Sequence, residues 1–383
     1  MKRLLVLTLL LFACFSVSAQ QSAGIDNALL LDYYQNQRFA EAYNYLKTVY
    51  PEPVTDTKAL ANLAYTSRMA GKLADAEGYY QRVYDKDSTN IAILFNLGSI
   101  NVSRGNNLRA LTYYKKILLK DSANFNVYKQ LASLSQNLFD TVTYNKYLVK
   151  ANTINPQEPD VAYDLGRLYI VFKKYDKAAV VFDKAIQADT ANLVLLKGKA
   201  EVTFLQKKYP ETVNNCIKLM QSGEKGSAII NWLAISYFKL RQYKLCIAAF
   251  SQLSGNMQNE STFYYQAMCY KSLNDYPNSI VYLQKALVDG ITPNAADYYT
   301  EIADAYGSLN QLKKSVTAYQ KSLQFKEAPL TYYSLANLYD VKLLDKKLAL
   351  KYYKKYLDSK PVPDQEQKYI DYAKIRIPEL GTK

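Results

Sequence analysis

The chain has 383 residues, and 49% of them are apolar, which excludes wholesale disorder. It contains 37 tyrosines and no histidine, so the commonest general base and the commonest metal ligand of proteins are both absent. The formal net charge is +14 at pH 7, which favours anionic partners.

The first residues have the pattern of a secretory signal. A charged start occupies residues 2–3, an apolar stretch residues 4–15 and a small-residue cleavage site residues 17–19. The apolar stretch is too short to span a bilayer. We therefore expect residues 1–19 to be a signal peptide cleaved after Ala19, and the protein to be exported, either periplasmic or outer-membrane associated.

A lipid anchor is the alternative for this segment. Leu11-Phe12-Ala13-Cys14 resembles a lipoprotein box in which Cys14 would be acylated. The bulky Phe12 fits that box poorly, and an adequate ordinary cleavage site follows it. The sequence therefore favours cleavage after Ala19 over acylation of Cys14.

The charge that remains after cleavage is still strongly positive. Of the 48 basic residues, Lys2 and Arg3 are lost, which leaves 46 against 34 acidic residues, or +12. In an exported protein such a charge indicates an anionic membrane surface, an anionic envelope polymer or an acidic protein partner. We expect no nucleic-acid partner.

A period of 34 residues runs through the rest of the chain. Small residues recur at this spacing, with a slip of one or two residues in the last repeats: Ala64, Gly98, Ala132, Gly166, Ala200, Ala234, Ala267, Ala303 and Ala336. A leucine usually precedes the small residue, and a tyrosine often follows three residues later. Apolar residues at spacings of three and four predict two amphipathic helices in each repeat. Small residues on both helices would let the pair approach closely.

The best example of the pattern is YDLGRLYIVFKKYDKAAVVFDKAIQAD, residues 163–189. It resembles the tetratricopeptide repeat, which has Leu-Gly, Tyr, Ala and Phe at these places. The consensus tryptophan is missing, Tyr144 stands where alanine is usual, and the tenth repeat needs an insertion near Leu344. These departures concern local packing.

The resemblance implies an all-α fold, a right-handed superhelical solenoid of about ten helix-turn-helix repeats. One helix pair cannot bury its own apolar face, so the repeats must stack. The array is expected over residues 20–362, and residues 363–383 are expected to form a C-terminal capping helix. The repeats start near residues 23, 57, 91, 125, 159, 193, 227, 260, 296 and 329.

Similar turns, DSTN (87–90), DSAN (121–124) and DTAN (189–192), separate some of the repeats. Their Asp or Ser/Thr side chains are expected to cap the next helix. The same Asp-Ser/Thr pattern, with Asp140-Thr141-Val142, looks like an O-glycosylation sequence of some periplasmic bacterial proteins. The hydroxyls that match it are Ser88, Ser122, Thr141 and Thr190. Capping and glycosylation are compatible with each other.

Enzyme signatures are absent from the sequence, which has no phosphate loop, dinucleotide fingerprint, Gly-x-Ser-x-Gly elbow or Cys-x-x-Cys pair. We therefore expect no catalytic activity, no cofactor and no metal site. Cys216 and Cys246 fall at core positions, and Cys269 falls beside the next small residue. Buried thiols are favoured, and a bridge between Cys246 and Cys269 is left open.

In the family that the chain resembles, the inner groove is lined by set positions of the first helix of each repeat. Carried over, these positions are Lys58, Tyr65, Arg68, Phe95, Lys129, Tyr163, Arg167, Lys197, Phe204, Asn231, Phe238, Tyr264 and Lys271. Towards the C-terminus they become acidic at Asp297, Asp304 and Asp340, with Tyr333 among them. Aromatic and cationic positions suit an extended peptide or a partner helix. The opposing interpretation is that these residues have no role in binding, because lysine and tyrosine are common everywhere in this chain.

The chain is thus expected to be a non-catalytic scaffold of the bacterial cell envelope that binds a protein or peptide along its concave groove. One alternative is a protein that binds carbohydrate or envelope polymer with tyrosines and lysines. Another is a lipid-anchored subunit of an outer-membrane assembly or secretion complex. A lysine cluster over residues 346–355 is either a solvated face or a docking site for anionic head groups or polymer.

Overall fold

The computed structural model describes residues 24–288 and 293–382. The predicted signal peptide and Cys14 lie outside the described residues. Contacts between Cα atoms divide the chain into two compact units, the first ending at Leu165 and the second beginning at Gly166. No strand occurs in the part of the chain that the structure describes, and no helix there is long and apolar enough to cross a bilayer.

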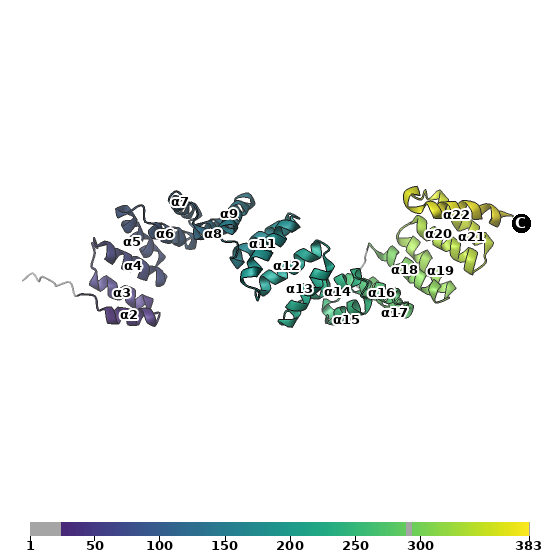
Figure 1. Cartoon of the computed structure of the whole chain (residues 1–383), viewed down its shortest axis with the longest axis horizontal. Helices are drawn as coiled ribbons and strands as arrows, with labels where there is room; N and C mark the ends of the chain where they lie inside the picture. Colours follow the sequence, from purple (N-terminus) through teal and green to yellow (C-terminus); the bar gives the residue numbers. More distant parts are fainter. Residues whose placement is uncertain (1–23, 289–292, 383) are drawn as a thin grey trace, which may run out of the picture. The chain divides into compact units, whose positions relative to one another are not determined.

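Helices alternate along the chain in pairs joined by short turns (Figure 1). The first helices of the pairs are α2 (Asn27–Gln35), α4 (Thr57–Met69), α6 (Ile91–Ser103), α8 (Phe125–Asn137), α10 (Pro159–Val171), α12 (Leu193–Leu205), α14 (Ser227–Lys239), α16 (Glu260–Ser272), α18 (Ala295–Ser308) and α20 (Pro329–Asn337). The second helices are α3 (Phe39–Val49), α5 (Leu73–Lys86), α7 (Asn107–Leu118), α9 (Thr141–Ile154), α11 (Tyr175–Ala188), α13 (Tyr209–Gln221), α15 (Tyr243–Phe250), α17 (Tyr276–Val288), α19 (Leu312–Phe325) and α21 (Lys346–Asp358). The helix α22 (Pro363–Gly381) follows them.

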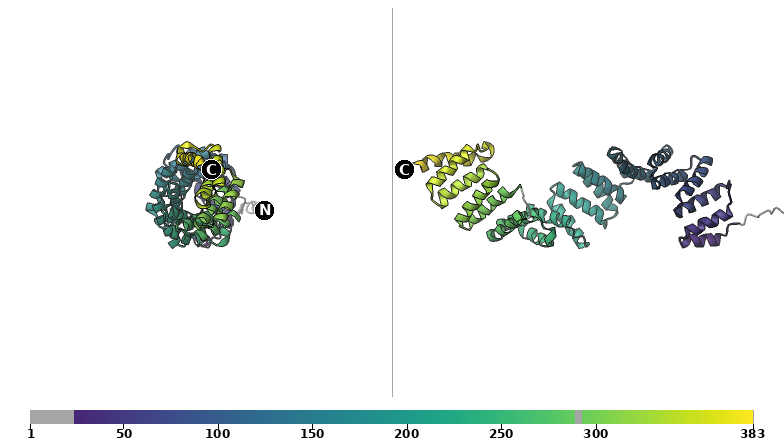
Figure 2. Two further views of the ribbon diagram at one scale, coloured as in Figure 1. Left: turned by 90° about the vertical axis from the view of Figure 1, so that its right-hand side faces the viewer. Right: turned by 180° about the vertical axis from the view of Figure 1, so that it is seen from behind.

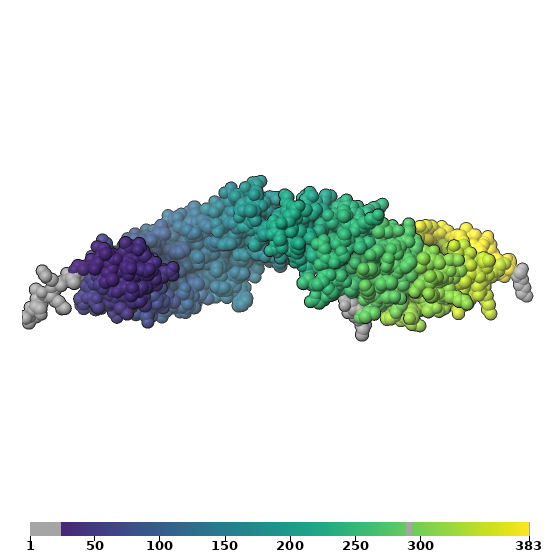
Figure 3. Space-filling view, turned by 90° about the horizontal axis from the view of Figure 1, so that it is seen from below, coloured from purple at the N-terminus to yellow at the C-terminus, as the bar shows by residue number. Residues whose placement is uncertain are grey.

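Within each unit, the second helix of a pair packs on the first helix of the next pair, as α3 does on α4, α5 on α6 and α17 on α18 (Figure 2). In the space-filling view of Figure 3 the colours change gradually with residue number within each unit, so neighbouring repeats are also neighbours at the surface. Paired helices stacked in sequence order confirm the all-α fold class and the tetratricopeptide-like solenoid that the 34-residue period predicts.

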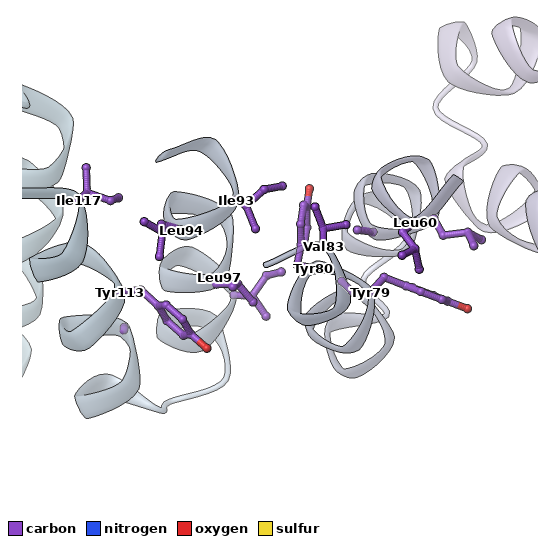
Figure 4. Close-up of a cluster of buried hydrophobic side chains, with 14 of the residues drawn as sticks. Leu60, Tyr79, Tyr80, Val83, Ile93, Leu94, Leu97, Tyr113 and Ile117 are labelled. Atoms are coloured by element: carbon purple, nitrogen blue, oxygen red, sulfur yellow. The ribbon is translucent and has the colours of Figure 1, made fainter. Parts of the chain in front are cut away.

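The core of the first unit shows why the repeats must stack. Tyr80 and Val83 of α5 are buried and lie toward Ile93 and Leu97 of α6, the first helix of the next repeat (Figure 4). Leu60 of α4 belongs to the same buried cluster. The apolar positions of the second helix are therefore covered on one side by its own first helix and on the other by the next repeat.

The turn inside each pair has one residue in the left-handed backbone region. These residues are Gln37, Gly71, Gly105, Phe139, Lys173, Lys207, Arg241, Asn274, Asn310 and Leu344. In the first nine pairs, the residue after the turn position donates its amide hydrogen to a carbonyl in the last turn of the first helix, as Lys72 N does to Ser67 O at 2.8 Å. This Schellman-type bond ends the first helix and reverses the chain. Only Gly71 and Gly105 supply the residue type that adopts this backbone without strain.

Glycines on the first helices allow aromatic rings of the second helices to sit directly against the backbone. Phe182 of α11 is fully buried and lies between Gly166 of α10 and Gly198 of α12. A Cβ atom at Gly198 would lie 2.6 Å from Cζ of Phe182, closer than real Cβ contacts allow. The same contact joins Gly98 of α6 and Tyr114 of α7. Ring packing thus requires the glycine at two positions of the 34-residue pattern, Gly98 and Gly166.

The helix α22 closes the C-terminal end of the second unit through a buried ion pair. The Asp340 side chain is 5% exposed, and its Oδ1 accepts a hydrogen bond from Arg376 Nη2 at 2.6 Å. Tyr333 of α20 packs against Tyr369 of α22 with ring centroids 4.7 Å apart. Tyrosine rings and one ion pair therefore fix the cap to the last repeat.

We predict that Gly198→Ala destabilises the protein by about 1–3 kcal/mol, because the added methyl group overpacks the ring of Phe182. The control is Gly78→Ala on the exposed face of α5, where a Cβ meets no atom within 4 Å. That change should stabilise the helix by up to about 1 kcal/mol. Chemical denaturation measures the change in unfolding free energy of both variants. In a Phe182→Leu background the cost of Gly198→Ala should shrink, and an unchanged cost would contradict the ring contact.

We also predict a pH-dependent contribution of the cap. The hydrogen bond from Arg376 holds the pKa of Asp340 below its ordinary value of 3.8. A carboxyl group whose pKa is lowered by folding stabilises the protein above that ordinary value, and the contribution is lost as the pH falls through the lower folded pKa. Arg376→Ala should cost about 2–3 kcal/mol at neutral pH, since it leaves a buried carboxylate unpaired.

The measurement is the difference in unfolding free energy between wild type and Arg376→Ala as a function of pH. This difference should narrow below pH 3.8. The exposed Lys374→Ala in the same helix is the control and should show no such narrowing. A difference between wild type and Arg376→Ala that is constant with pH would argue against the ion pair.

Candidate functional site

The predicted groove residues from Lys58 to Lys271 all lie on first helices and are exposed or half-buried. They are Lys58, Tyr65 and Arg68 on α4, Phe95 on α6, Lys129 on α8, Tyr163 and Arg167 on α10, Lys197 and Phe204 on α12, Asn231 and Phe238 on α14, and Tyr264 and Lys271 on α16. We call the surface that they share the first-helix face. Because the residues up to Tyr163 belong to the first unit and those from Arg167 to the second, each unit carries its own part of this face.

Several cations of the first-helix face are paired with the next repeat. In the first unit, Lys129 Nζ donates to Glu158 Oε1 at 2.8 Å and to Asp160 Oδ2 at 2.9 Å. The hydrogen bond to Glu158 raises the pKa of Lys129. Arg68 donates to the amide oxygen of Asn96 at 2.5 Å. These side chains therefore connect the first helices of successive repeats.

The second unit repeats this arrangement. Arg167 is ion-paired with Glu201, one repeat further along the chain. Lys271 is ion-paired with Glu301, and its Nζ lies 3.5 Å from Asp304 Oδ2. From the sequence, the cations and Asp304 are named as groove positions, but ion pairs between repeats are not considered. A search for carboxylates in the same register one repeat later would have found Glu201, which is 34 residues after Arg167, but not Glu301, which is 30 residues after Lys271.

Lys197 and Tyr65 differ from the paired cations. Lys197 is exposed, and it makes no ion pair with any described residue. The Tyr65 side chain is 45% exposed and meets the ring of Tyr34 edge-on at 6.0 Å. Together with Lys58, which is exposed and also forms no ion pair among the described residues, these side chains are available to a partner.

Two cavities open on the first-helix face of the second unit, over α16, α18 and α20. The first, of about 680 Å³, is lined by Asn259, Glu260, Ser261, Tyr264, Tyr265, Asn294, Asp297 and Tyr298, and we call it the Tyr264 cavity. The second, of about 570 Å³, includes Lys271, Asp304, Tyr319, Tyr333, Ser334 and Asn337, and we call it the Tyr333 cavity. Both volumes fall in the range of ligand sites.

The Tyr264 cavity combines stacked rings with carboxylates. The rings of Tyr264 and Tyr298 are stacked with centroids 5.3 Å apart. The hydroxyl of Tyr298 donates to Glu260 at 2.5 Å, and burial raises the pKa of Tyr298. Asp297 is exposed at the same cavity. Rings beside carboxylates can hold a cationic or aromatic side chain of a partner.

The Tyr333 cavity is polar on the side of α18 and aromatic on the side of α20. The hydroxyl of Tyr319 donates to Asp304, and burial raises the pKa of Tyr319. Lys271 reaches the same carboxylate from α16. Sequence reasoning found Lys271 and Asp304 but missed Tyr319, because Tyr319 lies on a second helix.

The expectation that Asp340 extends the acidic end of the groove is wrong. Asp340 is buried against Arg376 and also accepts a hydrogen bond from Tyr353 at 3.3 Å. It lies in a π-helical segment, Leu338–Lys342, where the spacing of an α-helix no longer gives the face of a residue.

The turns between repeats are capped by a different residue from the one expected. In the turn of residues 87–90, Asp87 Oδ1 accepts from the amide of Thr89 at 2.9 Å and shapes the turn. The cap of α6 is Asn90, whose Oδ1 accepts from Ile93 N at 3.2 Å. In the other two turns, Asp121 and Asp189 likewise accept hydrogen bonds within the turn, and Asn124 and Asn192 cap the next helix. The expected capping by Asp or Ser/Thr is thus wrong there, because each helix begins directly after the asparagine.

The four hydroxyls with the glycosylation pattern are all in exposed residues. Ser88, Ser122 and Thr190 lie in the turns between repeats, and Thr141 is the first residue of α9. Asp140 caps α9 by accepting from Thr143 N at 3.0 Å. The carboxylates beside the hydroxyls thus have structural roles, and glycosylation stays a prediction.

The cysteines have the character of core residues. Cys216, Cys246 and Cys269 are buried free thiols, so no bridge joins Cys246 and Cys269 in this structure. Burial raises the pKa of Cys216 to about 12. In the part of the chain that the structure describes, no group of three or more acidic or cysteine side chains could hold a metal ion.

Comparison with known proteins agrees with the repeat architecture. The family model of the tetratricopeptide repeat matches residues 296–329. Stress-induced-phosphoprotein 1 of Caenorhabditis elegans is 32% identical over 98 residues, 26% of this chain and 27% of that protein. The TPR repeat-containing protein MJ1428 of Methanocaldococcus jannaschii is 22% identical over 195 residues, 50% of this chain and 31% of that protein. The chain therefore spans less than a third of the length of these curated relatives.

Among solved structures, a tetratricopeptide repeat protein from Parabacteroides merdae has 18% sequence identity and a TM-score of 0.38. The similarity covers 76% of this chain and 97% of the other. The matched repeat, residues 296–329, corresponds to α18 and α19, and the same helix pairing recurs in the other repeats.

We predict that the protein isolated from its own organism carries glycan at Ser88, Ser122, Thr141 or Thr190. The exposed hydroxyls leave room for a sugar without loss of the hydrogen bonds that shape the turns. Intact-mass measurement before and after Ser/Thr→Ala replacement at the four positions tests this. A mass equal to that of the unmodified chain would contradict the prediction of glycosylation.

Proposed function

Because the chain is a tetratricopeptide repeat protein, we propose that it acts as a non-catalytic scaffold that binds a protein or an extended peptide along the first-helix face. Proteins of this family generally serve protein–protein interaction. The observation that carries the proposal is the pair of cavities over α16, α18 and α20, where tyrosine rings stand beside carboxylates. Aromatic side chains in pockets are typical of binding hot spots.

The chemistry of this face favours recognition over catalysis. Its carboxylates at Glu301 and Asp304 are engaged by Lys271, and Glu260 is engaged by the hydroxyl of Tyr298. A residue of the partner would replace one of these contacts or stack on the ring of Tyr264. Equilibrium binding to a largely preformed surface follows from this arrangement.

We further propose that the protein works in the cell envelope after export. The support is the signal-like pattern of residues 1–19 and the positive charge of the remaining chain. Intact-mass measurement also tests export, because the mature chain would begin at Gln20. A chain that begins with an acylated Cys14 would support the alternative of a lipid-anchored subunit of an outer-membrane assembly.

The test of the scaffold is in-cell crosslinking followed by mass spectrometry of the captured proteins. The face variant is Lys197→Glu with Asp297→Lys, two exposed residues on first helices of the second unit. Its matched control is Lys347→Glu with Asp358→Lys, two exposed residues of α21. Both variants keep the net charge, so only the location of the change differs.

We expect one dominant partner in wild type and in the control, and its loss from the face variant, with circular dichroism unchanged. A partner that persists in the face variant would place binding elsewhere on the protein. Capture of no protein, together with binding to isolated cell-wall material, would favour the polymer-binding alternative.

A further inference from the structure

Charge is unequally divided between the first and second helices near the C-terminal end of the second unit. The second helices α17 and α19 contain lysines and no acidic residue. The first helices α16 and α18 carry Glu260, Asp297, Glu301 and Asp304. The side of the repeats formed by the second helices is therefore strongly cationic, and its ligand chemistry differs from that of the first-helix face.

A separate cavity of about 640 Å³ lies on this side, lined by residues of α17, α18 and α19. We call it the outer cavity. Apolar atoms of Leu287, Ile302 and Ala318 line it, and Ile302 and Ala318 belong to the buried core. Its cationic members are Lys313, Lys314 and Lys321, and no acidic residue is among the described residues that line it.

Tyrosine rings hold two of these lysines in place. Lys314 Nζ lies 5.4 Å from the ring centroid of Tyr306, and Lys321 Nζ lies 5.4 Å from that of Tyr299. Tyr299 is stacked in turn on Phe325, with centroids 5.6 Å apart. Cation–π contacts leave the hydrogen-bond donors of an ammonium group available, unlike an ion pair with a carboxylate. Within the described residues, none of the three lysines forms an ion pair.

We propose that the outer cavity binds a small amphiphilic anion, a single alkyl chain that ends in a carboxylate or a phosphate. The head group pairs with Lys313, Lys314 and Lys321, and the chain lies on the apolar floor between α17 and α19. The volume is in the range of small-molecule sites. An inorganic anion would leave the floor exposed to water, whereas each buried methylene adds to the affinity of an alkyl chain.

This site is independent of the proposed scaffold function. It is lined by residues of α17, α18 and α19 and shares no lining residue with the Tyr264 and Tyr333 cavities. Either proposal can therefore fail without affecting the other.

The experiment is isothermal titration of the full-length mature protein with dodecanoate and, separately, dodecyl phosphate, each below the concentration at which it forms micelles. Inorganic phosphate is the probe without an alkyl chain, and dodecyltrimethylammonium is the probe without a negative charge. We expect saturable binding of one or both alkyl anions and no binding of the other two probes. Equal binding of the cationic amphiphile would overturn the proposal, and so would failure of both alkyl anions to bind.

Three variants localise the binding. Lys313→Glu, Lys314→Glu and Lys321→Glu combined should weaken it by roughly tenfold or more, because the head group then meets like charge. The combination of Lys115→Glu, Lys218→Glu and Lys244→Glu, at exposed lysines of α7, α13 and α15, makes the same change in net charge and should leave binding within roughly twofold. Thr317→Phe fills the cavity from an exposed position without a change in charge and should also abolish binding.

Circular dichroism and melting curves confirm that the variants are folded. Equal weakening in the two lysine variants would show unspecific attraction to a basic surface. Full binding by Thr317→Phe would show that the chain does not enter the cavity. Either result would overturn the proposed site.

Discussion

The structure depends on the close approach of paired helices, which buries aromatic rings of second helices against glycines of first helices. Phe182 lies between Gly166 and Gly198, so a ring from one helix fills the space between two neighbouring first helices. Because each helix pair leaves an apolar side uncovered, stability comes from contacts between sequence neighbours. The recurring small residue, the left-handed turn and the asparagine cap all serve this single requirement.

The same geometry decides which charges are available for binding. First helices of successive repeats lie close enough for Lys129 to reach Glu158 and for Lys271 to reach Glu301. Several of the cations that the sequence suggests for a partner thus join repeats, whereas Lys197 stays without an ion pair among the described residues. What remains for recognition is aromatic and acidic near the C-terminal end, where Tyr264 and Asp297 line a cavity.

Repeats eight and nine separate charge between their two sides. The helices α16 and α18 together carry Glu260, Asp297, Glu301 and Asp304 with one lysine, Lys271, whereas the charged residues of α17 and α19 are all lysines. Charged residues of either sign keep an outer face solvated and allow a helix to form. Neither requirement therefore explains why the two signs are separated. Two surfaces of opposite charge on one array suit a scaffold that meets chemically different partners, one on each side.

The sequence by itself determined the repeating helix pair, since spacings of three, four and 34 residues reflect helix geometry and the packing of each pair on the next. It also identified the small positions at Gly98 and Gly166. Only the tertiary structure decided what the side chains of the face contact. Arg167 and Glu201 are 34 residues apart, and their pairing depends on the distance between two first helices. The exclusion of Asp340 from the groove depended on a local π-helical turn, and the capping asparagines on where each helix begins. Cavities arise where several helices leave space between them, which no single stretch of sequence records.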